Sequence, residues 1–272
     1  MQNSADIIEK WYRKLKFPSS FDPEFYDMLK TVEIPESICI DTYDMQNTDG
    51  KYNLLSFLYM CQSLERRYSE KGLGEDVLLD TLSDLVRWTE TWSELKNTLY
   101  LGQLSWVSIP FKMEIFKLGR LQFCMQKAGR DVPAYGLKKD DNILGIHIPA
   151  GEALTLKACE DSLQRAKAFF ATYYPEYSYD FFFCHSWLLD TMLENILSAD
   201  SNILRFQKLF DIVTLDESDA IIRYVLRWGA ERKDVIALPT TTEFSKKVRN
   251  HILSGGKFYE GVGIIPKDRI QA

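Results

Sequence analysis

Two histidines and a cysteine stand where the sequence pattern predicts the ends of β-strands. His147 lies just before Ile148-Pro149, and Cys184 is followed directly by His185. A histidine at a strand end can act as a general base or bind a substrate, and a cysteine thiolate is a nucleophile. The alternatives are a buried imidazole that is hydrogen-bonded to the backbone and a thiol that only fills the core.

The alternation of side chains along a strand limits which of these groups can work together. Neighbouring strand residues point to opposite faces of a sheet, so Cys184 and His185 cannot easily form a nucleophile–base pair. Residues on two adjacent strands can, which leaves His147 with Cys184, or His147 with His185, as the pairs to test. No neighbour that would stabilise a thiolate at Cys184 is visible in the sequence.

Further polar candidates lie after the Cys184 strand. Ser186 and Trp187 come next in the chain and are expected to contact a substrate, with core packing as the alternative for Trp187. Arg205 and Gln207 share one face of residues 202–215, a run that alternates as a strand does. Arg205 can hold a carboxylate or a phosphate through two parallel hydrogen bonds, and the alternative is that this polar face is solvated.

The spacing of cysteines and histidines argues against a metal centre or a disulfide framework. The five cysteines include no CxxC pair, and the three histidines are far apart in the chain. Structural zinc sites and disulfide-rich domains both require close, paired spacing. We therefore expect no bound metal.

The elements that position these residues fall into two parts. Over residues 1–100, apolar residues recur every three to four positions, which predicts an all-helical domain. From Trp106 the period changes to two, which predicts strands. The second part is expected to contain a hairpin over 109–125, a strand over 142–149, a helix over 156–173, a strand over 177–185, a short helical stretch over 187–197, a long strand over 202–215, helices over 219–228 and 242–253, and a strand over 257–265.

Composition sets the broad class of the protein. The chain has 272 residues, and 33 lysines and arginines against 39 aspartates and glutamates give a net charge of −6. An acidic balance argues against a general nucleic-acid binder. No apolar run approaches the ~18 residues of a membrane span, and residues 1–8 lack the pattern of a signal peptide. We expect a cytoplasmic protein that binds a small molecule and neither nucleic acid nor membrane.

Three segments carry a resemblance to a known family: His147–Thr155 (HIPAGEALT), Cys184–Asp190 (CHSWLLD) and Ser201–Gln207 (SNILRFQ). Together they resemble the bacterial acyltransferase domain-containing proteins. In that family a helical N-acyltransferase N-terminal domain precedes a GNAT-like domain, where GNAT denotes the N-acetyltransferase fold. The likeness is sharpest over residues 144–210. It implies an α+β protein in which a helical domain, residues 1–100, packs on a GNAT-like mixed β-sheet domain with flanking helices, residues 101–272.

The resemblance implies transfer of an acyl group from acetyl-CoA or another acyl-CoA to an amine or a similar small nucleophile, by direct attack. GNAT enzymes cradle the CoA pyrophosphate with a Gln/Arg-x-x-Gly-x-Gly/Ala loop and the N-terminus of the next helix. The equivalent stretch here implies that Ala150, Gly151 and Thr155 hold the cofactor. It departs from the pattern because it has one glycine, a proline at 149 and an acidic residue at 152.

The resemblance also implies that His147 or Glu114 removes the proton from the acceptor, directly or through water. Glu114 is expected on the hairpin, where GNAT-like folds line the acceptor groove, although it can also be a solvated strand residue. The tyrosine that GNAT enzymes use as general acid has no counterpart in residues 191–198. The altered loop favours an alternative, a GNAT-like binding module without catalysis that recognises a small ligand or a protein. A second alternative is an enzyme that uses Cys184 as nucleophile.

Overall fold

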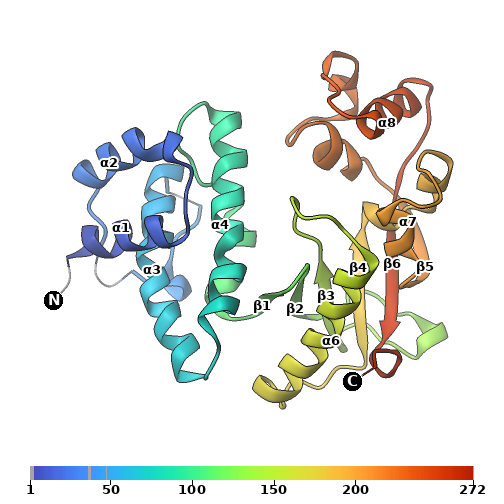
Figure 1. Cartoon of the computed structure of the whole chain (residues 1–272), viewed down its shortest axis with the longest axis horizontal. Coiled ribbons are helices and arrows are strands. Elements are labelled where there is room, and N and C mark those ends of the chain that lie inside the picture. The colour runs from blue at the N-terminus through green and yellow to red at the C-terminus, as the bar shows by residue number, and fades with distance from the viewer. Residues whose placement is uncertain (1–2, 36–37, 47, 272) are drawn as a thin grey trace. The chain divides into compact units, whose positions relative to one another are not determined.

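The computed structural model describes residues 3–35, 38–46 and 48–271, and the chain divides into two compact units, Met1–Leu118 and Gly119–Ala272 (Figure 1). Within the described residues, no helix combines the length and apolar character needed to cross a membrane.

The first unit is helical, as the sequence predicts. Its helices are α1 (Ser4–Lys14), α2 (Asp22–Thr31), α3 (Gly50–Glu70), α4 (Glu75–Lys96) and α5 (Leu104–Val107). Pro23 takes a position in the first turn of α2, where its missing N–H costs nothing. The helix α3 is buried around most of its circumference, because the consecutive residues 53–58 are all buried. It therefore forms the centre of this unit.

A mixed sheet organises the second unit, which contributes β2 (Leu121–Lys127), β3 (Asn142–His147), β4 (Phe181–Ser186), β5 (Asp211–Glu217) and β6 (Tyr259–Pro266). The strand β1 (Ile115–Leu118) is the last element of the first unit, and the strand order is β1-β2-β3-β4-β6-β5. The pair β3–β4 is parallel, whereas β2–β3, β4–β6 and β5–β6 are antiparallel. A parallel pair needs a crossover, which the helix α6 (Leu156–Tyr173) supplies. The predicted α+β fold with a mixed sheet is confirmed.

The two faces of this sheet are covered differently. On one face, Phe170 of α6 packs edge-on against Tyr179, which packs in the same way against Phe182 of β4. On the other face, the connection between β2 and β3 contributes Val132 and Leu137 to a cluster with Ile143, Phe183, Val262 and Ile264. Successive strand residues alternate between these faces. Each strand side chain therefore points either toward α6 or toward the connection between β2 and β3.

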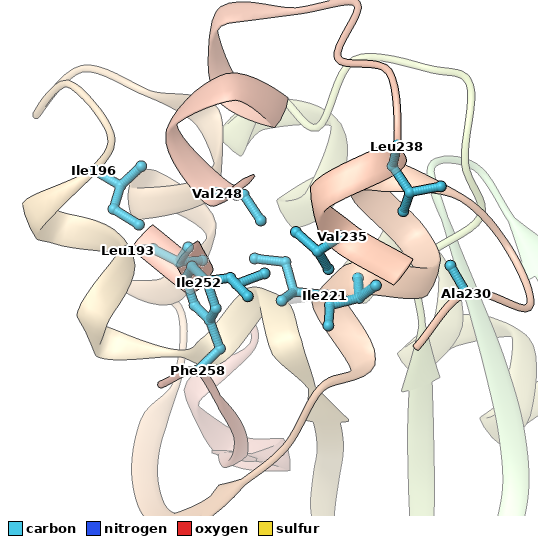
Figure 2. Packing of buried hydrophobic residues seen from close by; sticks show 10 residues of the cluster. Leu193, Ile196, Ile221, Ala230, Val235, Leu238, Val248, Ile252 and Phe258 are labelled. Carbon is cyan, nitrogen blue, oxygen red and sulfur yellow. The ribbon is translucent and has the colours of Figure 1, made fainter. Parts of the chain in front are cut away.

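A separate apolar cluster lies beyond the strands (Figure 2). It draws on the turns after β4, on a π-helical turn (Ile222–Leu226) and on the helix α8 (Glu243–Leu253). The buried members are Leu193, Ile196, Ile221, Ile222, Ala230, Val235, Leu238, Val248, Ile252 and Phe258. The sequence predicted α8 correctly, and the helix predicted over 219–228 is shorter, because residues 220–226 are helical and the last five of them form the π-helical turn.

Two strand predictions were wrong. Residues 202–215 are not one strand, because they form the helix α7 (Asn202–Gln207) followed by β5. The side chain of Ser201 accepts the N–H of Leu204 and caps this helix, a local signal that outweighs the alternation. Residues 109–113 are also not strand, because Pro110 opens a 3₁₀ turn there. The first strand therefore begins only at Ile115.

Candidate active site

The strands β3 and β4 separate toward their C-terminal ends. Their parallel pairing ends at Gly145 and Phe183. Each strand nevertheless continues beyond that point, because β3 stays paired with β2 as far as His147 and β4 stays paired with β6 as far as Ser186. The two strands are therefore parallel neighbours whose pairing ends before either strand does. Backbone groups on the facing edges of the diverging ends are left without a partner in the ladder.

His147 stands at the diverging end of β3. It lies directly opposite Gln122 of β2 in the antiparallel register, so both side chains project from the same face. The imidazole is partly buried, and desolvation lowers the pKa of His147 to about 4. It is therefore neutral near pH 7 and keeps one nitrogen that can accept a proton.

Cys184 and His147 lie on opposite faces, which contradicts their pairing as nucleophile and base. Leu144 pairs with Phe182, so Cys184 shares the face of these two residues, whereas His147 shares the face of Gly145. The Cys184 side chain is fully buried, and burial raises the pKa of this thiol far above its usual value. A buried thiol of this kind fills the core and supplies no thiolate.

His185 remains as the possible partner of His147. It lies two residues after Phe183, on the face of Gly145 and His147, and its side chain is exposed. The register therefore brings the two histidines to one face of the sheet at the two diverging strand ends, and it leaves Cys184 on the other face.

Ser186 and Trp187 both have structural contacts at the end of β4. The Ser186 hydroxyl accepts the N–H of Leu188 at 3.1 Å and caps a 3₁₀ turn. The Trp187 ring stacks on Tyr224 and Phe244, with ring centroids 6.4 and 6.3 Å apart, and packs against the cluster of Figure 2. Since Tyr224 is 58% exposed, this aromatic group extends from the core to the surface.

Arg205 and Gln207 do not share a strand face, because both lie on α7 and residues two apart on a helix point in different directions. The Gln207 amide donates to the carbonyl oxygens of Leu188 and Asp190, at 2.8 and 2.9 Å. It thereby holds α7 against the turn after β4. Arg205 is exposed.

The loop between β3 and α6 contains a glycine with a positive φ and ends at a capped helix N-terminus. Gly151 has a φ of +110°, which L side chains rarely adopt, so a larger residue there is strained. Thr155 caps α6 by accepting the N–H of Ala158 at 3.3 Å. The N–H groups of Leu156 and Lys157 have no acceptor among the described residues. Ala150 and Glu152 in this loop are exposed.

Glu114 lies outside the strands. It is exposed and directly precedes β1 in the first unit, and the expected place on a hairpin strand is therefore wrong. Across the residues that the structure describes, no group of three or more histidine, cysteine, aspartate or glutamate side chains is arranged to hold a metal ion.

Arg120, which the sequence did not single out, is the charged residue buried beside this loop. Its side chain is only 6% exposed, and its Nε donates to the carbonyl oxygen of Ala153 at 3.3 Å. Its backbone N–H and that of Leu121 both donate to Ser162 Oγ of α6, at 2.7 and 3.2 Å. An arginine in a glycine-containing turn is normally solvated, so the sequence carries no signal for this burial.

Comparisons with known proteins agree with this geometry. Residues 115–265 match the family described as GNAT-like C-terminal domain. Three similar solved structures are an acyltransferase with CoA and 10C-teicoplanin (TM-score 0.78, 21% identity), a mutant acyltransferase with octanoyl-CoA (0.77, 21%) and an acyltransferase with decanoyl-CoA (0.73, 22%). Each alignment covers 95% of this chain and 87% of the other. No curated protein matches the sequence significantly. The structural likeness shows a shared fold.

Proposed function

Since the chain belongs to the GNAT-like C-terminal domain family, we propose that it is an acyltransferase that moves an acyl group from acyl-CoA to an amine or a similar small nucleophile. The observation that carries the proposal is the divergence of β3 and β4 with a neutral histidine, His147, at its edge. Amide groups of an extended donor can pair with the backbone groups that the two strands leave unpaired there.

His147 is proposed as the general base. The acceptor nitrogen attacks the thioester carbonyl carbon, and its proton passes to the imidazole directly or through one water. The carbon–sulfur bond then breaks and CoA leaves as a thiolate. Because residues 191–198 contain no tyrosine to protonate this thiolate, the imidazolium of His147 returns the proton to it, which restores the neutral base. His185, on the same face, and Glu114 are the other candidates for proton transfer.

The donor's phosphates are proposed to lie at the start of α6. Ala150, Gly151 and Thr155 belong to the loop that precedes this 18-residue helix, and the free N–H groups of Leu156 and Lys157 point to an anion there. The exposed Glu152 can turn to solvent.

The acceptor is proposed to approach from the end of β4. Trp187, with the exposed Tyr224, offers an aromatic wall for an apolar or ring-containing acceptor, and Ser186 and Arg205 are the nearby polar candidates from the sequence. One structural neighbour binds both decanoyl-CoA and teicoplanin, which supports a small-molecule acceptor for this chain. Because the donor would be acyl-CoA, we propose a cytoplasmic location.

The alternative function, a binding module without catalysis, is favoured by the proline at 149 and the acidic Glu152 in the phosphate loop. Two measurements separate it from the enzyme. Isothermal titration with CoA, acetyl-CoA and octanoyl-CoA tests whether a donor binds, and release of free CoA thiol in the presence of amines tests turnover. Binding without thiol release, over a broad set of amines, would favour the module. The absence of both binding heat and thiol release would contradict the acyltransferase proposal.

A further inference from the structure

Arg120 is a buried arginine that forms no ion pair with any described residue. Its side chain is 6% exposed, and its Nε has a carbonyl oxygen as acceptor. Its two terminal nitrogens have no acceptor, and no carboxylate lies within ion-pair distance of it, within the part of the chain that the structure describes. Buried cations are ordinarily paired, because removing a charge from water is costly.

The position of this charge is fixed by the fold. Ser162 Oγ accepts the N–H groups of Arg120 and Leu121 and donates to the carbonyl of Ala158, so the turn before β2 is tied to α6. The guanidinium then reaches the carbonyl of Ala153, two residues before the residue that caps α6. The charge therefore lies beside the N-terminus of that helix.

Two sources of positive charge, the N-terminus of α6 and the guanidinium of Arg120, therefore lie close together. The N-terminus of an 18-residue helix carries a partial positive charge, and the N–H groups of Leu156 and Lys157 lack acceptors among the described residues. Arg120 adds a full charge beside them. The acidic group that attracts Arg120 is Glu152, which is exposed and in contact with solvent. An anion placed there would interact favourably with both the guanidinium and the helix N-terminus.

We propose that Arg120 and the N–H groups of Leu156 and Lys157 form a diphosphate-binding site, in which an arginine from the β1–β2 turn replaces the glycines that the β3–α6 loop lacks. A guanidinium can bind two phosphate oxygens at once through its free nitrogens. The ligand class is a nucleotide-linked diphosphate. Its identification with the diphosphate of acyl-CoA rests on the proposed function.

The rival explanation is that Arg120 only anchors the loop through the Ala153 carbonyl. The two explanations differ for Arg120→Met, which removes the charge and keeps an unbranched apolar side chain. If Arg120 is an anchor, this variant melts at a lower temperature. If Arg120 is held for a ligand, the unliganded variant is at least as stable as the wild type, because an uncompensated buried charge is removed.

The test is isothermal titration of the full chain with CoA, inorganic pyrophosphate and pantetheine, which has no phosphate. We expect Arg120→Gln to weaken CoA and pyrophosphate by roughly tenfold or more, because charge-assisted hydrogen bonds are lost. Pantetheine binding should not change. Arg130→Gln is the matched control, since the exposed Arg130 pairs with Asp216 elsewhere in the unit. Should Arg120→Gln fail to fold, Arg120→Lys keeps the charge and is expected to retain pyrophosphate binding.

The outcomes are distinguishable. CoA and pyrophosphate affinities that survive Arg120→Gln, or a pantetheine affinity that falls with them, would overturn the diphosphate site while leaving the acyltransferase proposal intact. Pyrophosphate binding that depends on Arg120 in a chain that neither binds acyl-CoA nor releases thiol would support the site and contradict the proposed function.

Discussion

The two units each contain a desolvated cation, but only the cation of the first unit forms ion pairs with described residues. In the first unit, the Lys14 ammonium donates to the carboxylates of Glu65 and Glu75, each at 2.6 Å, and lies 4.6 Å from the ring centroid of Trp11. In the second unit, Arg120 has only a backbone carbonyl as its side-chain acceptor among the described residues.

The pKa values reflect this difference. Desolvation lowers the pKa of Lys14, but hydrogen bonds and attraction from Glu65 and Glu75 reverse the effect, so the pKa of Lys14 is raised. The pKa of Arg120 is lowered because desolvation outweighs the attraction from its neighbours. The comparison teaches that folding alone accounts for the position of Lys14, whereas the position of Arg120, which forms no ion pair with a described residue, is consistent with the proposed diphosphate site.

The largest expected effect is on turnover, and it distinguishes His147, another desolvated group of the second unit, from Arg120. Glutamine at 147 cannot take a proton, so we expect His147→Gln to lower turnover by about 10²- to 10⁴-fold. CoA affinity should not change, because the proposed phosphate site is at the start of α6 and not at His147. Thiol release from octanoyl-CoA and titration of CoA measure the two quantities. A variant with wild-type turnover would remove His147 from the mechanism.

The second effect is on the pH dependence of stability. The folded-state pKa of His147 is about 4, against 6.5 in the unfolded chain. Above pH 6.5 both states are neutral, and as the pH falls toward 4 only the unfolded state gains a proton. The free energy of unfolding should therefore fall by about 3 kcal/mol over this window. Urea unfolding of wild type and His147→Gln at several pH values isolates this component, and identical pH profiles would contradict it.

The third effect tests the hydrogen bonds by which Ser162 holds the turn that contains Arg120. Ser162→Ala leaves the buried N–H groups of Arg120 and Leu121 without their acceptor, which should cost about 1–3 kcal/mol. Because the turn is released, pyrophosphate affinity should fall as well. Thr172→Ala is the matched control, since Thr172 makes the same kind of bond to its own helix on the exposed side of α6. Equal melting temperatures for the two variants would argue against this account.

The smallest effect tests the ion pairs of the first unit. Glu65→Gln weakens the ion pairs of Lys10 and Lys14, which are partly exposed, so we expect a loss of at most about 1 kcal/mol that shrinks in high salt. Arg120→Met should cause no loss. Thermal melts at low and high ionic strength give both values. A larger loss for Arg120→Met than for Glu65→Gln would break the comparison.

The sequence predicted the elements that carry strong local signals. The strand ending at His147 is a short apolar run closed by a proline, and α6 begins at a threonine that caps it. These signals placed the histidine and the phosphate loop next to each other in the chain. Residues 202–215 were misassigned because α7 is only six residues long, which is too short for helical periodicity to show against an alternating pattern.

The rest of the site depends on contacts between distant residues. Which face carries Cys184 follows from the register of β3 with β4, and the sequence fixes neither strand relative to the other. The burial of Arg120 follows from a bond between residues 42 positions apart, Arg120 and Ser162. Neither has a local pattern, so no reading of neighbouring residues reveals them.

The position of β6 in the sheet has a consequence for biosynthesis. It is the last strand described along the chain, yet it lies between β4 and β5 and pairs with both. The β3–α6–β4 segment is local in sequence and can form early in translation, whereas β5 has no neighbour until residues 259–266 leave the ribosome. Until residues 259–266 have been made, the nascent chain therefore carries the unpaired edges of β4 and β5 that β6 later covers, and exposed strand edges of this kind promote aggregation.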